Sequence, residues 1–225
     1  MIVETSLAQT IENFEEKLFY RRPLTTAAKR ELCYWLETRL GKSGSYNGMF
    51  APTAKDFQEG IVLFSGDRVS SRAAIGHILG EEACRLLLIF SPDIRETIPL
   101  YKSAVREMLL LLRKGDTRRR ASGFYCCGTC TCALWRHLLA GGFDNQKMRL
   151  YDGIKILKKS RDGKGGWKRF PYYYTLMTFL DFDRNMIREE LEYGLPRLER
   201  LQKRKAQNIY QERRIDLIER LLERK

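Results

Sequence analysis

Hydrophobic residues recur every three or four positions along most of the chain, and no segment alternates hydrophobic and polar residues over the length of a strand. This spacing is typical of amphipathic helices that bury one face. It predicts helices at 4–20, 24–40, 53–65, 70–90, 94–114, 125–139, 146–160, 171–181, 184–204 and 207–224. The pattern therefore predicts an all-α protein of about ten helices.

Prolines and glycines mark where several of these helices begin and end. Pro23 and Pro171 suit the first turn of a helix, where the missing N–H removes no hydrogen bond. Gly41, Gly66 and Gly115 stand where the chain needs a left-handed residue after a helix. These positions predict short loops between the helices.

Three segments of the chain share one layout: "YWLETRLGKSGSYNGMFAPTAKDFQEGIVLF", "LLLLRKGDTRRRASGFYCCGTCTCALWRHLL" and "IKILKKSRDGKGGWKRFPYYYTLMTFL". In each, a helix ends, about nine polar and glycine-rich residues follow, and a phenylalanine precedes the next helix. The phenylalanines are Phe50, Phe124 and Phe170. We interpret the three segments as helical hairpins of one kind.

The last segment, "RDGKGGWKRFPYYYTLMTFL", resembles the repeat of the α/α-toroid proteins, which are the squalene and hopene cyclases and the protein prenyltransferase β-subunits. The likeness is clearest over 147–181 and weaker over 95–140 and 25–65. It implies stacked helical hairpins that form a partial α/α toroid or curved solenoid, in one domain over 1–225, with 184–225 as C-terminal amphipathic helices. A second copy, as in a homodimer, is one way to close such a ring.

The family's catalytic motifs do not carry over with this resemblance. The cyclases use a DxDD motif, and "DFD" at 181–183 lacks the acidic residues that should follow. The Asp-x-Cys and distant His that hold zinc in prenyltransferases are also not found in the sequence. The resemblance therefore implies the architecture and leaves the activity open.

Composition adds a strong positive charge to this picture. The chain has 225 residues, with 41 Lys plus Arg against 28 Asp plus Glu, a net charge of +13. Such a surplus attracts nucleic acids, anionic lipids or phosphorylated small molecules. No stretch is apolar over a membrane span and the N-terminus is not a leader peptide, so a cytoplasmic location is expected.

If the hairpins lie side by side in parallel, their loops meet at one end and form a ligand site. The basic rim would contain Arg118, Arg119, Arg120, Lys164, Lys168 and Arg169, with Lys42 and Arg161 nearby. Aromatic residues below it would be Phe124, Trp167, Tyr172 and Tyr173. Three helix N-termini would add N–H groups that favour anions. The alternative is that the aromatic residues only fill space between hairpins.

Four cysteines, Cys126, Cys127, Cys130 and Cys132, lie within seven positions at the start of the helix predicted over 125–139. Three interpretations stay open. Cys126, Cys127 and Cys130, with Cys84 from "HILGEEACR", are candidate zinc or iron–sulfur ligands, although no cofactor is predicted. Thiolates near a helix N-terminus and arginines are candidate nucleophiles. Small buried packing residues are the third interpretation.

The candidate catalytic residues are Cys127, Cys130, Asp56 and His77. The favoured function is binding, and processing if the protein is an enzyme, of an isoprenoid- or lipid-like ligand with an anionic head. Such an enzyme would be a transferase or cyclase that uses a thiolate or an acid. The alternatives are a non-enzymatic nucleic-acid-binding solenoid and a metal-stabilised interaction module. The solenoid would also use the arginines of the C-terminal stretch "RLERLQKRKAQNIYQERRIDLIERLLERK", which could instead meet a partner helix or simply form two amphipathic helices.

Overall fold

The computed structural model of this protein describes residues 1–119, 123–141 and 144–223, and side-chain surroundings are not described over 116–119. The helices are α1 (Leu7–Phe19), α2 (Thr26–Glu37), α3 (Ala54–Glu59), α4 (Arg72–Phe90), α5 (Thr97–Arg119), α6 (Gly128–Gly141), α7 (Gln146–Lys159), α8 (Tyr172–Asp181), α9 (Arg184–Gln202) and α10 (Ile209–Leu222). Two short strands, β1 (Ile61–Val62) and β2 (Arg68–Val69), form an antiparallel pair. The all-α prediction is confirmed. None of the described helices is both long and apolar enough to cross a membrane.

The chain separates into two compact units, which are described individually. The N-terminal unit contains Met1–Leu63 and Arg68–Arg118, and the C-terminal unit contains Phe64–Asp67 and Arg119–Lys225. The turn between β1 and β2 therefore belongs to the C-terminal unit although both strands belong to the other. The single-domain expectation stays a prediction.

In the N-terminal unit, α4 is the central buried helix, and α1, α2 and α3 each pack against it. Phe14 of α1 and Phe90 of α4 place their rings 5.8 Å apart. The Arg85 guanidinium lies 2.6 Å from the Glu15 carboxylate and 3.6 Å from Glu82, and all three side chains are buried. Buried charges of this kind are tolerated because they are paired.

In the C-terminal unit, α6 and α8 run parallel and start at the same end. Gly128 at the start of α6 lies against the Arg169 carbonyl, just before α8. One turn further along, the Cys132 sulfur lies 3.6 Å from the Thr175 hydroxyl. After another turn, Arg136 donates a 2.7 Å hydrogen bond to Asp181. The loops that precede α6 and α8 therefore meet, as the hairpin hypothesis requires for these two segments.

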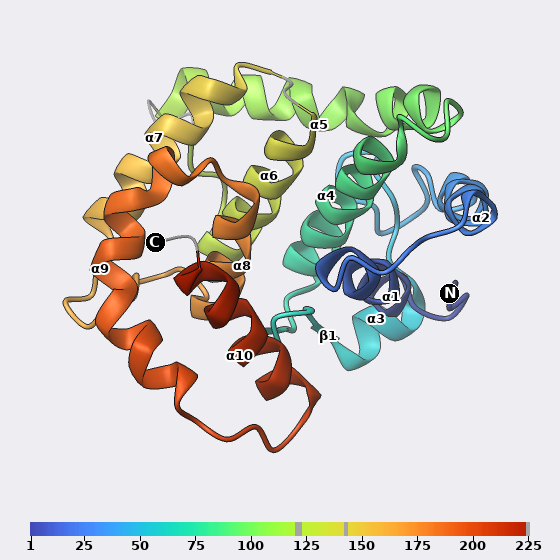
Figure 1. Cartoon of the computed structure of the whole chain (residues 1–225). Coiled ribbons are helices and arrows are strands. Elements are labelled where there is room, and N and C mark those ends of the chain that lie inside the picture. The colour runs from blue at the N-terminus through green and yellow to red at the C-terminus, as the bar shows by residue number, and fades with distance from the viewer. Residues whose placement is uncertain (120–122, 142–143, 224–225) are drawn as a thin grey trace. The chain divides into compact units, whose positions relative to one another are not determined.

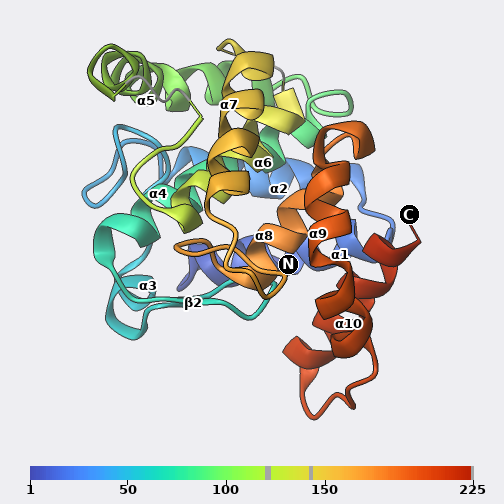
Figure 2. The same ribbon diagram turned by 90° about the vertical axis from the view of Figure 1, so that its left-hand side faces the viewer.

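The remaining helices of the C-terminal unit surround the α6–α8 pair. Helices α7 and α9 contact each other; they lie to the left of the pair in Figure 1 and in front of it in Figure 2, which looks from that side. Helix α10 packs against α8 and α9. The buried residues of α10 include Leu217, Ile218 and Leu221, so its apolar face covers the neighbouring helices as the amphipathic pattern predicts.

Two of the three repeated loops close in the same manner. An isolated antiparallel bridge joins Leu40 to Phe50 in the first loop, and another joins Arg161 to Trp167 in the last. Each bridge ends shortly before the next helix, α3 or α8. The shared layout of these segments is therefore a structural similarity as well as a sequence pattern. The toroid resemblance stays a prediction.

Five details of the helix prediction were wrong. The helix predicted over 53–65 ends at Glu59, because Gly60 turns left-handed (φ +72°) and the β-branched pair Ile61–Val62 then forms β1. Gly66 lies in the β1–β2 turn, and Gly115 lies inside α5. Pro23 precedes Thr25, the residue that caps α2, and Pro171 is itself the N-cap of α8, so both prolines stand just outside the first turn.

Candidate ligand-binding site

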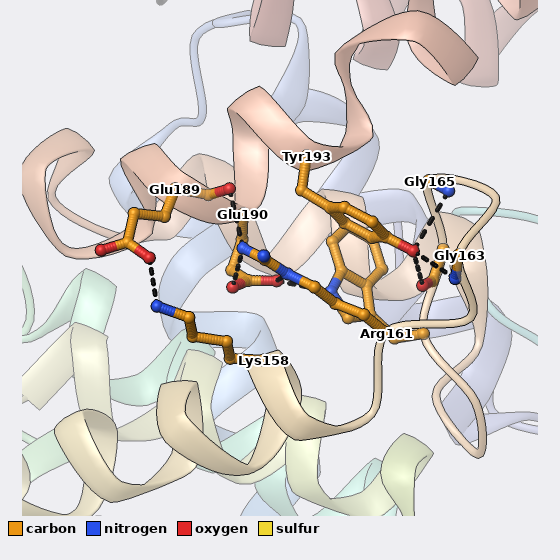
Figure 3. Close-up of polar contacts among 9 residues, drawn as sticks. Lys158, Arg161, Gly163, Gly165, Glu189, Glu190 and Tyr193 are labelled. Atoms are coloured by element: carbon orange, nitrogen blue, oxygen red, sulfur yellow. Dashed lines mark hydrogen bonds and ion pairs between the residues drawn. The ribbon is translucent and has the colours of Figure 1, made fainter.

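The glycine-rich turn over 161–167 is held in place by α9. Asp162 accepts backbone hydrogen bonds from Lys164 (2.7 Å) and Gly166 (2.9 Å) and a 3.0 Å bond from the Tyr193 hydroxyl. The same hydroxyl oxygen accepts the N–H groups of Gly163 (2.8 Å) and Gly165 (3.3 Å). Figure 3 shows Tyr193 reaching from α9 to the turn.

Two cations, Arg161 in this turn and Lys158 just before it, are paired with acids of α9. Arg161 forms two hydrogen bonds with Glu190, at 2.7 and 3.1 Å, and stacks over the Tyr193 ring at 4.5 Å. The buried Glu190 also accepts a 2.7 Å bond from the Trp167 indole. Lys158 pairs with Glu189 (Figure 3). Arg161 is therefore neutralised by Glu190, and its place in an anion-binding rim stays a prediction.

The aromatic residues expected to line a cavity pack against one another. The Trp135 ring stacks on Phe170 at 5.7 Å, and Phe170 meets Phe124 edge-on at 5.9 Å. Trp167 is buried and contacts Phe179 at 5.2 Å. In the described structure, Phe124 and Trp167 therefore fill the space between α6, α8 and their loops, which was the alternative interpretation.

The three helix N-termini expected to bind an anion are capped by the chain itself. Asp56 at α3 accepts bonds from the backbone and hydroxyl of Thr53 and also from Ser6 and Leu7 at the start of α1. The Cys127 sulfur at α6 accepts the Cys130 N–H at 3.4 Å.

At α8, the Asp67 carboxylate accepts the Tyr174 N–H and the Ser65 hydroxyl. Burial raises the pKa of Asp67, while the bond from Ser65, nearby Arg214 and the Tyr174 N–H oppose that shift. These carboxylates and this sulfur occupy the positions where a ligand anion was expected. Asp56 thus caps two helices, and its role as an acid or base stays a prediction.

The rim residues fall in several places. Arg118 and Arg119 are in the last turn of α5, where side chains are not described, and Arg120 lies outside the described residues. Lys164, Lys168 and Arg169 are exposed on the loop before α8, and Arg169 stacks over Phe124 at 5.6 Å. Of the predicted ligand-binding residues, Tyr173 is the one that lines a described cleft in the C-terminal unit.

This cleft lies between α8, α9, α10 and the loop that joins α9 to α10, and it has a volume of about 470 Å³. Its cations are Arg204, Lys205 and Arg214, and its apolar residues are Leu201, Ile215 and Ile218. Tyr173, Gln207 and Gln211 complete the lining. None of the residues described as lining it is acidic. The volume is within the roughly 300–1,000 Å³ that is usual for small-ligand sites.

Arg214 is held firmly at the edge of this cleft. Its Nε donates a 2.8 Å bond to the Ser65 carbonyl, and its guanidinium stacks on the Tyr173 ring at 4.1 Å. Beside it, Arg197 stacks on Tyr172 at 3.8 Å. Because these contacts fix the guanidinium plane and use one of its five N–H donors, Arg214 is pre-organised to bind an anion.

The sequence indicated nucleic-acid binding or a partner helix for the C-terminal basic stretch, and not the ligand site. The sequence feature that could have indicated the cleft is the run "QKRKAQNIYQERR", in which cations greatly outnumber acids. The sequence did not show that this stretch folds back as a helical hairpin beside α8. That fold brings Tyr173 to Arg214.

Three of the clustered cysteines form a thiol group at the start of α6. The sulfurs of Cys126 and Cys130 lie within 4.8 Å of each other, and both side chains hydrogen-bond to Cys127. Cys126 is exposed, Cys127 is half-buried and Cys130 is buried. Cys132 is buried and hydrogen-bonds toward Thr175, so it is a packing residue.

The hydrogen bonds within this thiol group shift the pKa values of its members in opposite directions. Bonds from the Cys126 and Cys130 side chains lower the pKa of Cys127, and the N–H groups of Cys130 and Thr129 act in the same direction. The bond to Cys127 raises the pKa of Cys126 to about 11, and bonds to Cys126 and Cys127 raise the pKa of Cys130. The arrangement concentrates thiolate character on Cys127.

The other sequence candidates lie in the N-terminal unit. His77 is buried, stacks on Tyr46 at a centroid distance of 4.1 Å, and shares a 3.1 Å hydrogen bond with Glu81. Cys84 is buried near the Met49 sulfur, and burial raises the pKa of its thiol. Within this unit, His77 and Cys84 are held by neighbouring core residues.

No protein-family model, curated protein or solved structure shows significant similarity to this chain. Its function is therefore inferred from the geometry of these sites.

Proposed function

We propose that this protein binds a ligand with a phosphate-type anionic head and an apolar body in the cleft between α8, α9 and α10. The observation that carries the proposal is the placement of Arg204, Lys205 and Arg214 above an apolar floor that includes Leu201 and Ile218, with no acid among the described lining residues. Guanidinium and ammonium groups bind phosphate oxygens, and the floor removes apolar surface from water.

The proposal is limited to binding. The lining residues that the structure describes include no acid, histidine or cysteine, so the cleft itself supplies no evident general base or nucleophile. The candidate thiol Cys127 lies at the start of α6, and Tyr173 is the predicted site residue that belongs to the cleft.

The test is a calorimetric titration of the full chain with three probes: farnesyl diphosphate, inorganic diphosphate and farnesol. We expect farnesyl diphosphate to bind most tightly. Inorganic diphosphate and farnesol should each bind at least about tenfold more weakly, a difference of about 1.4 kcal/mol in binding free energy. Equal binding of farnesyl diphosphate and diphosphate would refute the apolar part of the proposal. Absence of binding by all three would refute it entirely.

A substitution in the cleft then tests whether the ligand binds there. Arg214→Gln should weaken farnesyl diphosphate binding by about ten- to a hundredfold, since a hydrogen bond to a charged group contributes roughly 1.5–3 kcal/mol. Lys164→Gln is the matched control, because Lys164 is equally cationic, is exposed and lies outside the cleft. The same loss in both variants would show that only net charge matters.

A second candidate is the binding of single-stranded nucleic acid. It is favoured by two adjacent guanidinium–tyrosine stacks, Arg197 on Tyr172 and Arg214 on Tyr173, and by the net charge of +13. Such surfaces bind backbone phosphates and stack bases. Affinity for a labelled oligothymidine should then fall steeply with salt, because each phosphate contact releases counterions. A flat salt response would exclude this candidate.

A further inference from the structure

A group of three thiols is a distinct chemical feature of the C-terminal unit that the ligand-binding proposal does not use. Cys126 and Cys127 directly precede α6, and Cys130 lies in its first turn. The first turn of α6 therefore brings Cys130 back beside the two cysteines that precede the helix. The Cys127 sulfur lies beside this turn, because it accepts the Cys130 N–H at 3.4 Å.

The spacing of these sulfurs suits a single soft metal ion. Tetrahedral bonds of about 2.3 Å from zinc to thiolate place two sulfurs roughly 3.8 Å apart. The Cys126 and Cys130 sulfurs already lie within 4.8 Å of each other, so a side-chain shift of at most about 1 Å would bring them to that separation. The exposed Cys126 provides an entry path from solvent.

The backbone around the group favours negative sulfur. The Cys130 N–H donates to the Cys127 sulfur at 3.4 Å, and the start of α6 places the positive end of the helix dipole beside it. Gly128 lets the backbone approach Arg169 closely, since a Cβ there would lie 2.1 Å from the Arg169 carbonyl oxygen. The position of this helix start, and with it the sulfur group, is thus fixed by packing.

We infer that Cys126, Cys127 and Cys130 form a thiolate site for one soft cation of the Zn²⁺ or Cu(I) class. Thiolates are the ligands that select such ions. The three sulfurs supply three positions, and a ligand outside this group would complete the coordination. Binding deprotonates the thiols and releases their protons to solvent, without any change in oxidation state.

The site should be tested by titrating the reduced, metal-free full chain with Co²⁺ under anaerobic conditions. We expect a thiolate-to-cobalt charge-transfer band that saturates at one ion per chain and disappears when Zn²⁺ is added. Bound Zn²⁺ should also protect the exposed Cys126 from iodoacetamide, as measured by peptide mass. Absence of the band, or alkylation of Cys126 at the same rate with and without Zn²⁺, would overturn the inference.

Variants make the test specific. Cys130→Ser should remove most of the band, and Cys132→Ala is the control because Cys132 lies in the same segment but bonds toward Thr175. If Cys130→Ser fails to fold, as circular dichroism would show, the exposed Cys126→Ser gives the same comparison. An equal band in these variants and the parent would refute the site. Arg214→Gln should leave the cobalt signal unchanged, which separates this inference from the ligand proposal.

Discussion

The glycine-rich turn at 161–167 and the cleft beside α10 are both basic in sequence, and they differ in what surrounds their cations. In the turn, Arg161 pairs with Glu190, and Lys158, just before it, pairs with Glu189. In the cleft, Arg204, Lys205 and Arg214 line a space whose described lining contains no acid. The comparison indicates that an anion site depends on whether acids line the same space as the cations after folding, and the number of cations in a segment does not reveal this.

The largest effect is expected from removing the acid that braces the turn. Glu190→Ala leaves the half-buried Arg161 and the buried Trp167 indole without their partner, and an orphaned charge together with an unsatisfied buried N–H costs about 3 kcal/mol. For a chain of this size the melting temperature should fall by roughly 6–12 °C. Glu190→Gln should recover part of this loss, because its amide oxygen can still accept from Trp167. An unchanged melting temperature in Glu190→Ala would show that Glu190 does not stabilise the turn.

The next largest effect concerns the cleft and should appear in binding. Arg204→Glu places a negative charge among the cleft cations, so affinity for farnesyl diphosphate should fall by at least about tenfold, or 1.4 kcal/mol. The melting temperature should change little because Arg204 is exposed. Arg188→Glu on α9, the helix that precedes the loop of Arg204, is the charge-matched control outside the cleft. Equal losses in the two variants would place the ligand elsewhere.

A moderate loss of stability is expected from Tyr193→Phe. The change removes the hydroxyl that accepts from Gly163 and Gly165 and donates to Asp162, and keeps the ring beneath Arg161. The free energy of unfolding should fall by about 1 kcal/mol, measured by urea denaturation. Ligand affinity should stay the same. A change in affinity without a change in stability would contradict the separation of the two regions.

The smallest effect is a pH dependence at Asp162. Burial acts to raise its pKa, but hydrogen bonds from the Lys164 and Gly166 N–H groups and from Tyr193 outweigh it, and the pKa is lowered. Because the pKa of Asp162 is lower in the folded state, its ionised carboxylate stabilises the fold at pH values above its unfolded-state pKa of about 3.9. This contribution is lost as the pH falls through the folded-state pKa. Asp162→Asn keeps the acceptor oxygen, so the melting-temperature difference from the parent should be present at pH 7 and shrink below pH of about 4. A difference independent of pH would show that the charge is irrelevant.

The helices were predictable from sequence because each buries one face against its neighbours. The bounds of α7, α8 and α9 differ from the predicted ones by at most two residues. The helix predicted over 53–65 was wrong because Phe64 lies in a buried turn, where its hydrophobic character does not signal a helix. Hydrophobic spacing alone does not distinguish a short helix followed by a hairpin from one longer helix.

The site was less predictable, because it depends on pairing across long separations. Arg161 and Glu190 are 29 positions apart, and only the fold shows that they neutralise each other. Likewise, the sequence suggested that the start of α8 is open to an anion, while Asp67 occupies it from more than a hundred positions away. Tyr173 was identified from its aromatic character, but its neighbour Arg214 follows from how α10 folds back on α8.

The β1–β2 turn has a consequence for dissecting this protein into pieces. Residues Phe64–Asp67 are part of the C-terminal unit, where Phe64 lies under Arg213 and Asp67 caps α8. An expressed fragment starting at residue 119 would lose that cap, together with the Ser65 carbonyl that orients Arg214. A truncation intended to isolate this half would therefore need the tetrapeptide restored, either grafted through a linker or supplied in trans.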